Sequence, residues 1–256
     1  MILAIYNPKG GCGKTTTAVN LATDLARRGR SVLLVDLEAD MGASISLGVG
    51  PADKHASIFE LLLNERRPTD AVRPVPGVPN LQMVTGSPAL AGIDAALRNA
   101  RQPERRLGDC IRPLAASVDD VVIDSPSNFT VLSLSVPTLA HHLVVPIRAD
   151  YLSLESLAHL LRWYRDRGAG RVPLAHISGI LLTMVDYRRE ATREIVDIIR
   201  VHNRRGVFRT EIPDDPRASE APSHGVPLLL YAPRSRAARA YQGLATELLQ
   251  RTERAR

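Results

Sequence analysis

Apolar and polar positions follow two different periods along the chain. Short, nearly uninterrupted apolar runs are typical of strands buried on both faces, and they occur at Ile2–Tyr6, Ser31–Val35, Leu81–Val84, Asp120–Ile123, Leu143–Pro146 and Ile177–Met184. Stretches with the spacing of amphipathic helices lie between and after them, at Thr15–Arg28, Ser57–Asn64, Glu104–Ala116, Leu154–Arg167, Arg193–Asn203 and Arg234–Arg251. Strands joined by crossover helices predict an α/β fold with a doubly wound, mostly parallel sheet and helices on both faces.

The alternation continues without an internal repeat, a low-complexity stretch or an obvious linker. The proline-containing segment Arg67–Pro79 is predicted to be a loop within a domain rather than a boundary between two. A length of 256 residues suits one large α/β domain, and 45% apolar residues are enough to form its core. We therefore expect a single domain over residues 1–256.

A glycine-rich segment connects the first predicted strand to the first predicted helix, and it reads Tyr6-Asn-Pro-Lys-Gly-Gly-Cys-Gly-Lys-Thr-Thr-Thr17. Glycines let the backbone wrap a phosphate, and the N–H groups and dipole of a helix N-terminus attract anions. Lys14 is placed to reach the β- and γ-phosphates of a nucleotide, and the Thr15 hydroxyl to bind Mg²⁺. The expected nucleotide contacts are those of a P-loop, namely Lys9, Gly10, Gly11, Cys12, Gly13, Lys14, Thr15 and Thr16.

Charge is distributed unevenly along the chain. The net charge is +6, with 15 basic and 15 acidic residues in 1–150 against 18 arginines, no lysine and 12 acidic residues in 151–256. A basic C-terminal part favours an anionic partner, either nucleic acid or a membrane surface, and an arginine-rich solvated surface is the alternative. The N-terminus lacks the basic start of a signal peptide, and no run approaches the roughly 20 apolar residues needed to cross a bilayer, so we expect a cytoplasmic protein.

The P-loop departs from the usual pattern in a specific way. Pro8 stands where a glycine is usual, and a second lysine, Lys9, directly precedes the glycines. This form resembles the deviant P-loop of the ParA/MinD family of ATPases. The resemblance implies a P-loop NTPase fold that uses ATP and Mg²⁺, with weak hydrolysis unless a partner stimulates it. It also implies an ATP-dependent homodimer in which Lys9 reaches the phosphates of the partner's ATP, where a cation offsets several negative charges.

The resemblance extends over almost the whole chain and is strongest to the ParA branch, which partitions chromosomes and plasmids. Val121–Ser127 is similar to the family's Walker B and second switch, so Asp124 and Asp36 are implied as outer-sphere partners of Mg²⁺ together with Thr15. Glu38 stands where the family has the Asp that positions the attacking water. The extra methylene moves the carboxylate by about an ångström, enough to slow hydrolysis unless the loop compensates, and Asp40 is the alternative group. The implied catalytic residues are Lys9, Lys14, Glu38 and Asp124.

Two further sets of residues are implied by the ParA resemblance. Pro213 and Asp214 lie in a segment similar to the one that contacts adenine, and a solvated Pro-Asp turn is the alternative interpretation. Arg188 and Arg217 match arginines that hold the DNA backbone in ParA-type proteins. Guanidinium contacts to phosphate read no bases, so DNA binding would be non-specific and strongly salt-dependent. The implied partners are non-specific DNA and a ParB-like activating protein, with the protein associated with the nucleoid.

Three alternative functions share this P-loop. A MinD-like membrane-associated ATPase needs an amphipathic C-terminal helix, and Leu248–Arg256 is charged and lacks aromatics. A redox branch related to the nitrogenase iron protein needs cluster cysteines, and neither Cys12 nor Cys110 is suitably placed, while Ser125 follows Asp124. A ParA-like ATPase that positions a protein cargo, such as carboxysomes or chemoreceptor clusters, would share all these motifs, and residues 55–106, which resemble the family least, would then carry the cargo specificity.

Overall fold

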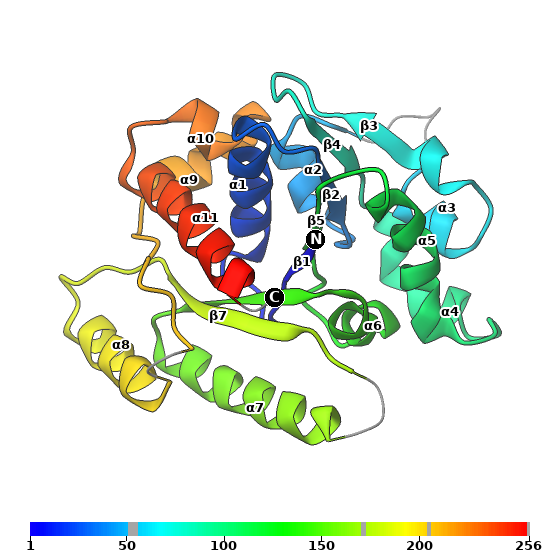
Figure 1. Cartoon of the computed structure of the whole chain (residues 1–256). Coiled ribbons are helices and arrows are strands. Elements are labelled where there is room, and N and C mark those ends of the chain that lie inside the picture. Colours follow the sequence, from blue (N-terminus) through cyan, green and yellow to red (C-terminus); the bar gives the residue numbers. More distant parts are fainter. Residues whose placement is uncertain (51–55, 170–172, 204–205, 255–256) are drawn as a thin grey trace.

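The computed structural model describes residues 1–50, 56–169, 173–203 and 206–254. A seven-stranded sheet in the order β3-β4-β2-β5-β1-β6-β7 forms its centre, with helices on both faces (Figure 1). The strands are β1 (Ile2–Ile5), β2 (Val32–Asp36), β3 (Val72–Pro74), β4 (Leu81–Val84), β5 (Asp120–Asp124), β6 (His142–Arg148) and β7 (His176–Thr183). All neighbouring strands are parallel except β3 and β4, so the predicted doubly wound α/β fold is confirmed.

Helices follow the strands in the expected alternation. The α-helices are α1 (Lys14–Arg27), α2 (Gly42–Ser46), α3 (Ile58–Leu62), α4 (Ile93–Ala96), α5 (Arg106–Ala115), α6 (Val131–Leu139), α7 (Tyr151–Gly168), α8 (Glu190–His202), α9 (Pro216–Glu220), α10 (Leu228–Tyr231) and α11 (Arg236–Arg254). Four 3₁₀ helices join them in the described residues, η1 (Pro68–Ala71), η2 (Pro88–Gly92), η3 (Pro103–Arg105) and η4 (Ala221–His224). Of the segments interpreted from the sequence, His55 and the last two residues of Leu248–Arg256 lie outside the described residues.

Two buried apolar clusters hold the layers together, one on each face of the sheet. Strand β1 contributes to both, because alternate side chains point to opposite faces: Ile2 and Ala4 join the cluster with helices α3 to α8, whereas Leu3 and Ile5 join the one with α1, α2, α10 and α11. All four residues of β1 are buried. A central strand covered on both faces explains why its sequence shows no polar alternation.

Several elements were not predicted, among them β3, α6 and the short helices α2, α4, α9 and α10. The segment Arg67–Pro79, expected to be a loop, contains η1 and β3, and β3 pairs antiparallel with β4 at the edge of the sheet. Three residues ending in Pro74 are too short to show a strand period, so only pairing with β4 reveals them. Helix α6 was missed because Ser133 and Ser135 are buried, apolar residues surround it, and Pro137 lies inside it, so it shows no amphipathic stripe.

The carboxyl ends of the parallel strands meet at one edge of the sheet, and this edge carries the candidate site. The P-loop follows β1, Asp36 ends β2 and Asp124 ends β5, and Asp36 and Asp124 are register partners. Since β5 lies between β2 and β1 in the sheet, the segments that follow β2 and β5 both lie on the β5 side of the P-loop. We call the segment after β2, which contains Glu38, the first switch, and the segment after β5, which contains Ser127, the second switch. Ligands of open parallel sheets bind at this edge.

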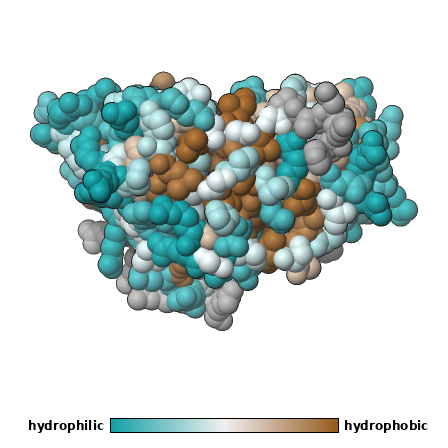
Figure 2. Space-filling view, turned by 90° about the horizontal axis from the view of Figure 1, so that it is seen from above, coloured by the Kyte–Doolittle hydropathy of each residue, from teal (hydrophilic) through white to brown (hydrophobic). Residues whose placement is uncertain are grey.

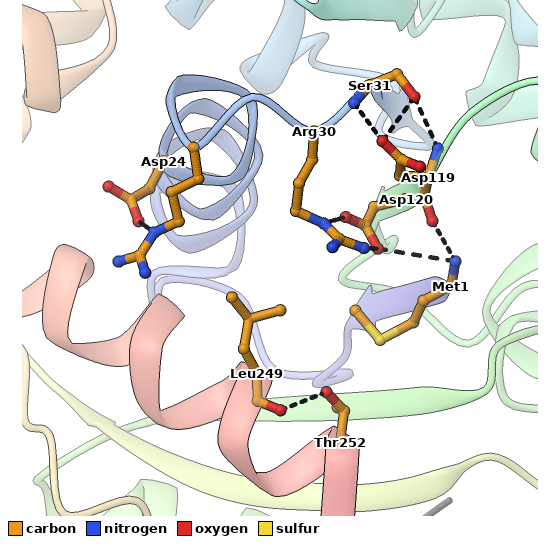
Figure 3. A network of polar contacts seen from close by, with 9 residues as sticks. Met1, Asp24, Arg30, Ser31, Asp119, Asp120, Leu249 and Thr252 are labelled. Atoms are coloured by element: carbon orange, nitrogen blue, oxygen red, sulfur yellow. Dashed lines mark hydrogen bonds and ion pairs between the residues drawn. The ribbon is translucent and has the colours of Figure 1, made fainter.

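The opposite edge is held by ion pairs and hydrogen bonds (Figure 3). Arg30, just after α1, binds the carboxylate of Asp120, with Nη2 to Oδ1 at 3.0 Å, and Asp120 is completely buried. The N-terminal ammonium of Met1 lies 3.7 Å from the same carboxylate. Ser31 and Asp119 add hydrogen bonds between the two loops, with Ser31 N to Asp119 Oδ2 at 2.8 Å. The contacts fasten the C-terminal end of α1 to the start of β5.

Large apolar side chains also remain at the surface. Figure 2 shows apolar atoms gathered in the middle of one face, between hydrophilic flanks. The most exposed of the large apolar residues in the described part of the chain include Phe129, Tyr151 and Leu152, each about two-thirds exposed. None of the described helices combines the length and apolar character needed to cross a membrane.

Candidate nucleotide-binding site

Contacts with the two strands β6 and β7 hold the P-loop in place. Gly11 and Gly13 have φ values of 70° and 83°, in the left-handed region that favours glycine. The Thr183 hydroxyl at the end of β7 donates to the carbonyl of Cys12 at 2.9 Å. The Asn7 side chain receives the N–H of Lys9 at 2.9 Å and donates to a carbonyl of β6. Helix α1 starts directly after this loop with no side-chain cap, so its N-terminus can accept an anion.

Lys14 is 5% exposed and points to the second switch. Its Nζ donates to Ser127 Oγ at 2.9 Å and to the carbonyl of Lys9 at 3.1 Å, and it lies 4.0 Å from Glu38 Oε1. Glu38 in turn accepts a hydrogen bond of 2.6 Å from Ser127. The expected catalytic residues Lys14 and Glu38 are therefore brought together, whereas Asp40 is exposed. This placement favours Glu38 over Asp40 as the group that faces the phosphate end of the site.

The two aspartates at the strand ends differ in their contacts. Asp36 accepts from Ser44 N and Oγ at 2.9 and 2.7 Å and from Glu38 N at 3.0 Å, so its carboxylate holds the first switch loop. Both oxygens of Asp124 are buried and have no hydrogen-bond partner within the part of the chain that the structure describes. Burial, followed by the charge of Asp36, raises the pKa of Asp124 well above its ordinary value. The Thr15 hydroxyl and the positive charge of Lys14 lower the pKa by a smaller amount.

A bare buried carboxylate next to a P-loop threonine is the donor set that a hard cation needs. Carboxylate and hydroxyl oxygens are the protein ligands that Mg²⁺ prefers, usually through some of its waters. Thr15 and Asp124 both face this point, and a Cβ added to Gly42 of α2 would lie only 3.2 Å from Thr15 Cγ2. The residues present therefore fit a magnesium ion beside Thr15 and Asp124.

Lys9 is held within its own chain. Its Nζ donates to Ser153 Oγ at 2.7 Å and to Asp150 Oδ1 at 3.3 Å, both at the start of α7. Asp150 also caps α7 by accepting from Ser153 N at 2.8 Å. Burial tends to raise the pKa of Asp150, but the hydrogen bonds from Ser153 and Lys9 outweigh it, so the pKa is lowered. The side chain of Lys9 remains 28% exposed, at the edge of the P-loop.

Pro213 and Asp214 line a hollow beside the P-loop. The hollow has a volume of about 700 Å³, and its walls include Val185, Asp186 and Arg188. The segment is fixed to the end of β7, because Val185 N donates to the carbonyl of Ile212 at 3.0 Å and Asp214 N to that of Val185 at 3.1 Å. Thr183 and Met184, just before Val185, are the nearest neighbours of Gly13. Val185, which lines the hollow, therefore directly follows the residues that contact the P-loop.

Comparison with known proteins agrees with this geometry. The profile of a family described as an AAA domain matches residues 1–166. Over 250 residues the chain is 37% identical to the chromosome partitioning protein ParA of Myxococcus xanthus, covering 98% of this chain and 88% of the relative. It is 36% identical over 247 residues to the sporulation initiation inhibitor protein Soj of Bacillus subtilis, covering 96% and 97%. The chain belongs to the ParA/MinD family of ATPases.

A solved structure of similar shape carries a nucleotide. Cobyrinic acid a,c-diamide synthase from Mycobacterium smegmatis, with bound ADP and magnesium, has a TM-score of 0.84 and 28% identity, over 100% of this chain and 96% of that one. The P-loop NTPase fold expected from the family resemblance is thus confirmed. Within a ParA/MinD ATPase, the residues that meet at the carboxyl edge of the sheet occupy the nucleotide side of the fold.

The two arginines singled out from ParA-type sequences are exposed, but each already has a carboxylate partner. Arg188 forms a bidentate pair with Asp186, both contacts at 2.8 Å, and its side chain is 87% exposed. Arg217 Nη1 binds Glu220 at 2.8 Å and is 57% exposed. Arg188 also lines the hollow of Pro213, so the structure brings a predicted DNA contact and the predicted base contacts to one place.

Several residues of this ParA/MinD site were not singled out from the sequence. Ser127 connects Lys14 to Glu38, and Asp150 and Ser153 hold Lys9. Gly86 packs closely against the first switch, since a Cβ added at this position would lie 2.6 Å from the carbonyl oxygen of Glu38. The sequence could have indicated Ser127 and Asp150 as site residues, since both are polar and follow the ends of predicted strands. It could not have indicated Gly86, because only the contact with the first switch explains why a glycine is needed there.

Proposed function

We propose that this chain is an ATP-dependent dimerising switch that binds DNA without sequence preference and hydrolyses ATP to partition a chromosome or plasmid. Residues 1–256 would act as one ATPase domain. The observation that carries the proposal is the meeting of Lys14, Thr15, Glu38 and Asp124 at the carboxyl edge of the sheet, with a second P-loop lysine beside them. The name of the relative from Myxococcus xanthus, a chromosome partitioning protein, supports the biological role.

In this proposal the P-loop amides and Lys14 bind the phosphates of ATP, and Thr16 contributes at the start of α1. Thr15 and Asp124 hold Mg²⁺, and Asp36 supports them by fixing the first switch loop. The metal, when bound, neutralises phosphate charge as the terminal phosphoryl group leaves. Pro213 and Asp214 contact the base, because the hollow they line includes Val185, which directly follows the β7 end that contacts the P-loop.

Glu38 orients the attacking water in the proposed reaction. Its Oε1 lies 4.0 Å from Lys14 Nζ, and its side chain is 17% exposed, so water reaches it. Its carboxylate sits on a loop that packs on Gly86 rather than on a helix or strand. Binding of a ParB-like partner near this loop would hold Glu38 in place, which accounts for weak hydrolysis without the partner.

Dimerisation would require Lys9 to leave Asp150 and Ser153. In the single chain its ammonium is neutralised by a carboxylate, and the phosphates of a second chain's ATP offer a stronger anionic partner. Phe129, Tyr151 and Leu152 flank the same edge and are exposed, so they provide apolar area for a contact between two chains. Lys9 would then make the contact depend on the terminal phosphate.

The DNA-binding part of the proposal rests on arginines in the C-terminal part of the chain. Arg217 and Arg234 line one shallow hollow, and the guanidinium of Arg234 has no partner within the described residues. Arg188 and Arg236 line the neighbouring hollow. The ion pairs of Arg188 and Arg217 are exposed and therefore weak, so phosphates can replace the carboxylates. Such a surface binds DNA by charge and not by sequence.

The arrangement of α11 counts against membrane association as the main activity. Its apolar side chains face α1 and are buried, including Ala237, Tyr241, Leu244 and Leu248. An interfacial helix needs an apolar face that is free to enter the lipid. Positioning of a protein cargo uses the same switch, so it differs from DNA partition only in the partner.

The experiment that tests the switch is a molar-mass measurement by light scattering after size exclusion, with Mg-ADP and with a non-hydrolysable ATP analogue. We expect a monomer with ADP and a dimer with the analogue. Lys9→Ala should bind the analogue and remain monomeric, because the lysine is not needed for binding in its own chain. A chain that binds the analogue tightly and stays monomeric would contradict the dimerisation step.

A further inference from the structure

Ser127 lies three residues beyond Asp124, and its hydroxyl joins the P-loop to the first switch. The distances are 2.9 Å from Lys14 Nζ to Ser127 Oγ and 2.6 Å from Ser127 Oγ to Glu38 Oε1. An ammonium group only donates and a carboxylate only accepts, so the direction of each bond is fixed. Ser127 accepts from Lys14 and gives its single proton to Glu38. The direct distance from Lys14 to Glu38 is 4.0 Å, so the hydroxyl carries the connection.

We infer that Ser127 is a positioning residue for Glu38. When a nucleotide binds, Ser127 loses the hydrogen bond that it accepts from Lys14 and keeps the hydrogen bond that it donates to Glu38. The inference rests on the proposed function and deepens it. A carboxylate that orients water needs one oxygen held and the other free. Ser127 occupies Oε1, so Oε2 remains available to the attacking water.

The length of Glu38 makes such a contact necessary. A glutamate has one more rotatable bond than an aspartate, so its carboxylate samples more positions unless a neighbour restrains it. The other contacts of the first switch act on its backbone: Asp36 accepts from Glu38 N at 3.0 Å, and Gly86 packs against the carbonyl oxygen of Glu38. Among the described residues, Ser127 is the hydrogen-bond donor to the Glu38 side chain. The hydroxyl therefore restrains the extra methylene that distinguishes Glu38 from an aspartate.

Nucleotide binding separates the two hydrogen bonds of Ser127. A phosphate oxygen is a stronger acceptor for Lys14 than a neutral hydroxyl, so Lys14 moves to the phosphate. The proton that Ser127 gives to Glu38 does not depend on Lys14, and this bond remains. Loss of the hydroxyl should therefore impair the hydrolysis step, while nucleotide affinity stays equal or increases, because the phosphate no longer competes with Ser127 for Lys14.

The test compares Ser127→Ala with Ser127→Thr, which keeps a hydroxyl. Ser125→Ala is the matched control, because the Ser125 hydroxyl donates to the carbonyl of Ile5 at 2.6 Å and takes no part in the Lys14–Ser127–Glu38 chain. The full chain with Mg-ATP and duplex DNA is assayed for steady-state hydrolysis over a range of ATP concentrations, and the Kd for Mg-ADP is measured separately. We expect Ser127→Ala to lower kcat about tenfold or more, with KM changed by less than about threefold. Ser127→Thr should restore most of kcat.

A double-variant cycle separates positioning from general damage. In Glu38→Asp the side chain is too short to keep the contact with Ser127, so adding Ser127→Ala should change kcat by less than about twofold. An unchanged kcat in Ser127→Ala, or a full further loss in the Glu38→Asp background, would overturn the inference. No turnover by the unmodified chain would contradict the proposed function instead. The Mg-ADP measurement then decides the inference, since weaker binding by Ser127→Ala would overturn it.

Discussion

The bare carboxylate of Asp124 gives the most informative stability prediction. Both of its oxygens are buried without a hydrogen-bond partner in the described residues, beside the charge of Asp36. Leaving a buried polar group unsatisfied costs about 1–3 kcal/mol, and more for a charge. Asp124→Asn keeps the shape and removes the charge. We therefore expect it to raise the unfolding free energy of the nucleotide-free protein by at least about 1 kcal/mol near pH 7–8, a Tm increase of roughly 2–4 °C per kcal/mol for a chain of this size.

The pH dependence fixes the sign of this effect. The pKa of Asp124 is raised in the folded protein, so the folded state holds a proton that the unfolded state has lost. Stability therefore falls as the pH rises from the ordinary value of 3.8 to the raised folded pKa, and the penalty is then constant. The advantage of Asp124→Asn should be smallest in acid and should grow with pH.

The assay is thermal unfolding in EDTA after nucleotide removal, repeated with ADP and Mg²⁺. Wild type should gain stability from Mg²⁺ with ADP, and Asp124→Asn should lose most of the part that depends on the metal. Asp36→Asn is the matched control with the opposite expected sign, because an amide cannot accept all the hydrogen bonds from Ser44 and Glu38. A lower Tm for Asp124→Asn in EDTA would refute the reasoning, since it would mean that the carboxylate is satisfied without a metal.

Two further predictions test the support of the site. Gly86→Ala places a Cβ 2.6 Å from the carbonyl oxygen of Glu38, so we expect a loss of about 1–3 kcal/mol in unfolding free energy and slower ATP hydrolysis. Gly92→Ala is the control and should be neutral, because its Cβ would meet nothing within 4 Å. Equal stability of both variants would contradict the packing argument. Asp120→Asn removes the buried negative charge that pairs with Arg30. Because Arg30 is 35% exposed and can reach water, we expect a cost of about 2–3 kcal/mol by urea denaturation, with no change in nucleotide affinity. A loss below about 0.5 kcal/mol would mean that this pair does not stabilise the fold.

The sequence was sufficient where neighbouring residues act together. The P-loop lies in one contiguous segment, so its glycines and Lys14 could be recognised directly. Asp36 and Asp124 followed from the rule that parallel strands end at one edge. The link between Lys14 and Glu38 could not be predicted, because it depends on β5 lying between β1 and β2 and on where Ser127 then points.

The same limit explains the missed elements. Strand β3 exists because β4 offers it an edge, and α6 exists because surrounding helices bury its serines and Pro137. Tertiary contacts decide both, and no local period reports them. The resting position of Lys9 on α7 is likewise a contact between residues 141 positions apart. A pattern in the sequence can suggest what a lysine does, but not which carboxylate holds it.

Binding to non-specific duplex DNA, with ADP and with ATP over a salt series, tests the central claim most directly. Arg217→Glu is the test variant, and Arg67→Glu is its matched control. Like Arg217 with Glu220, Arg67 forms an exposed ion pair with a carboxylate three residues further along the chain, Asp70, but it lies in the neutral part of the sequence. We predict binding that requires ATP, weakens steeply with salt and is lost in Arg217→Glu only. Failure to bind DNA under every nucleotide condition, in a chain that still binds ATP, would contradict the account.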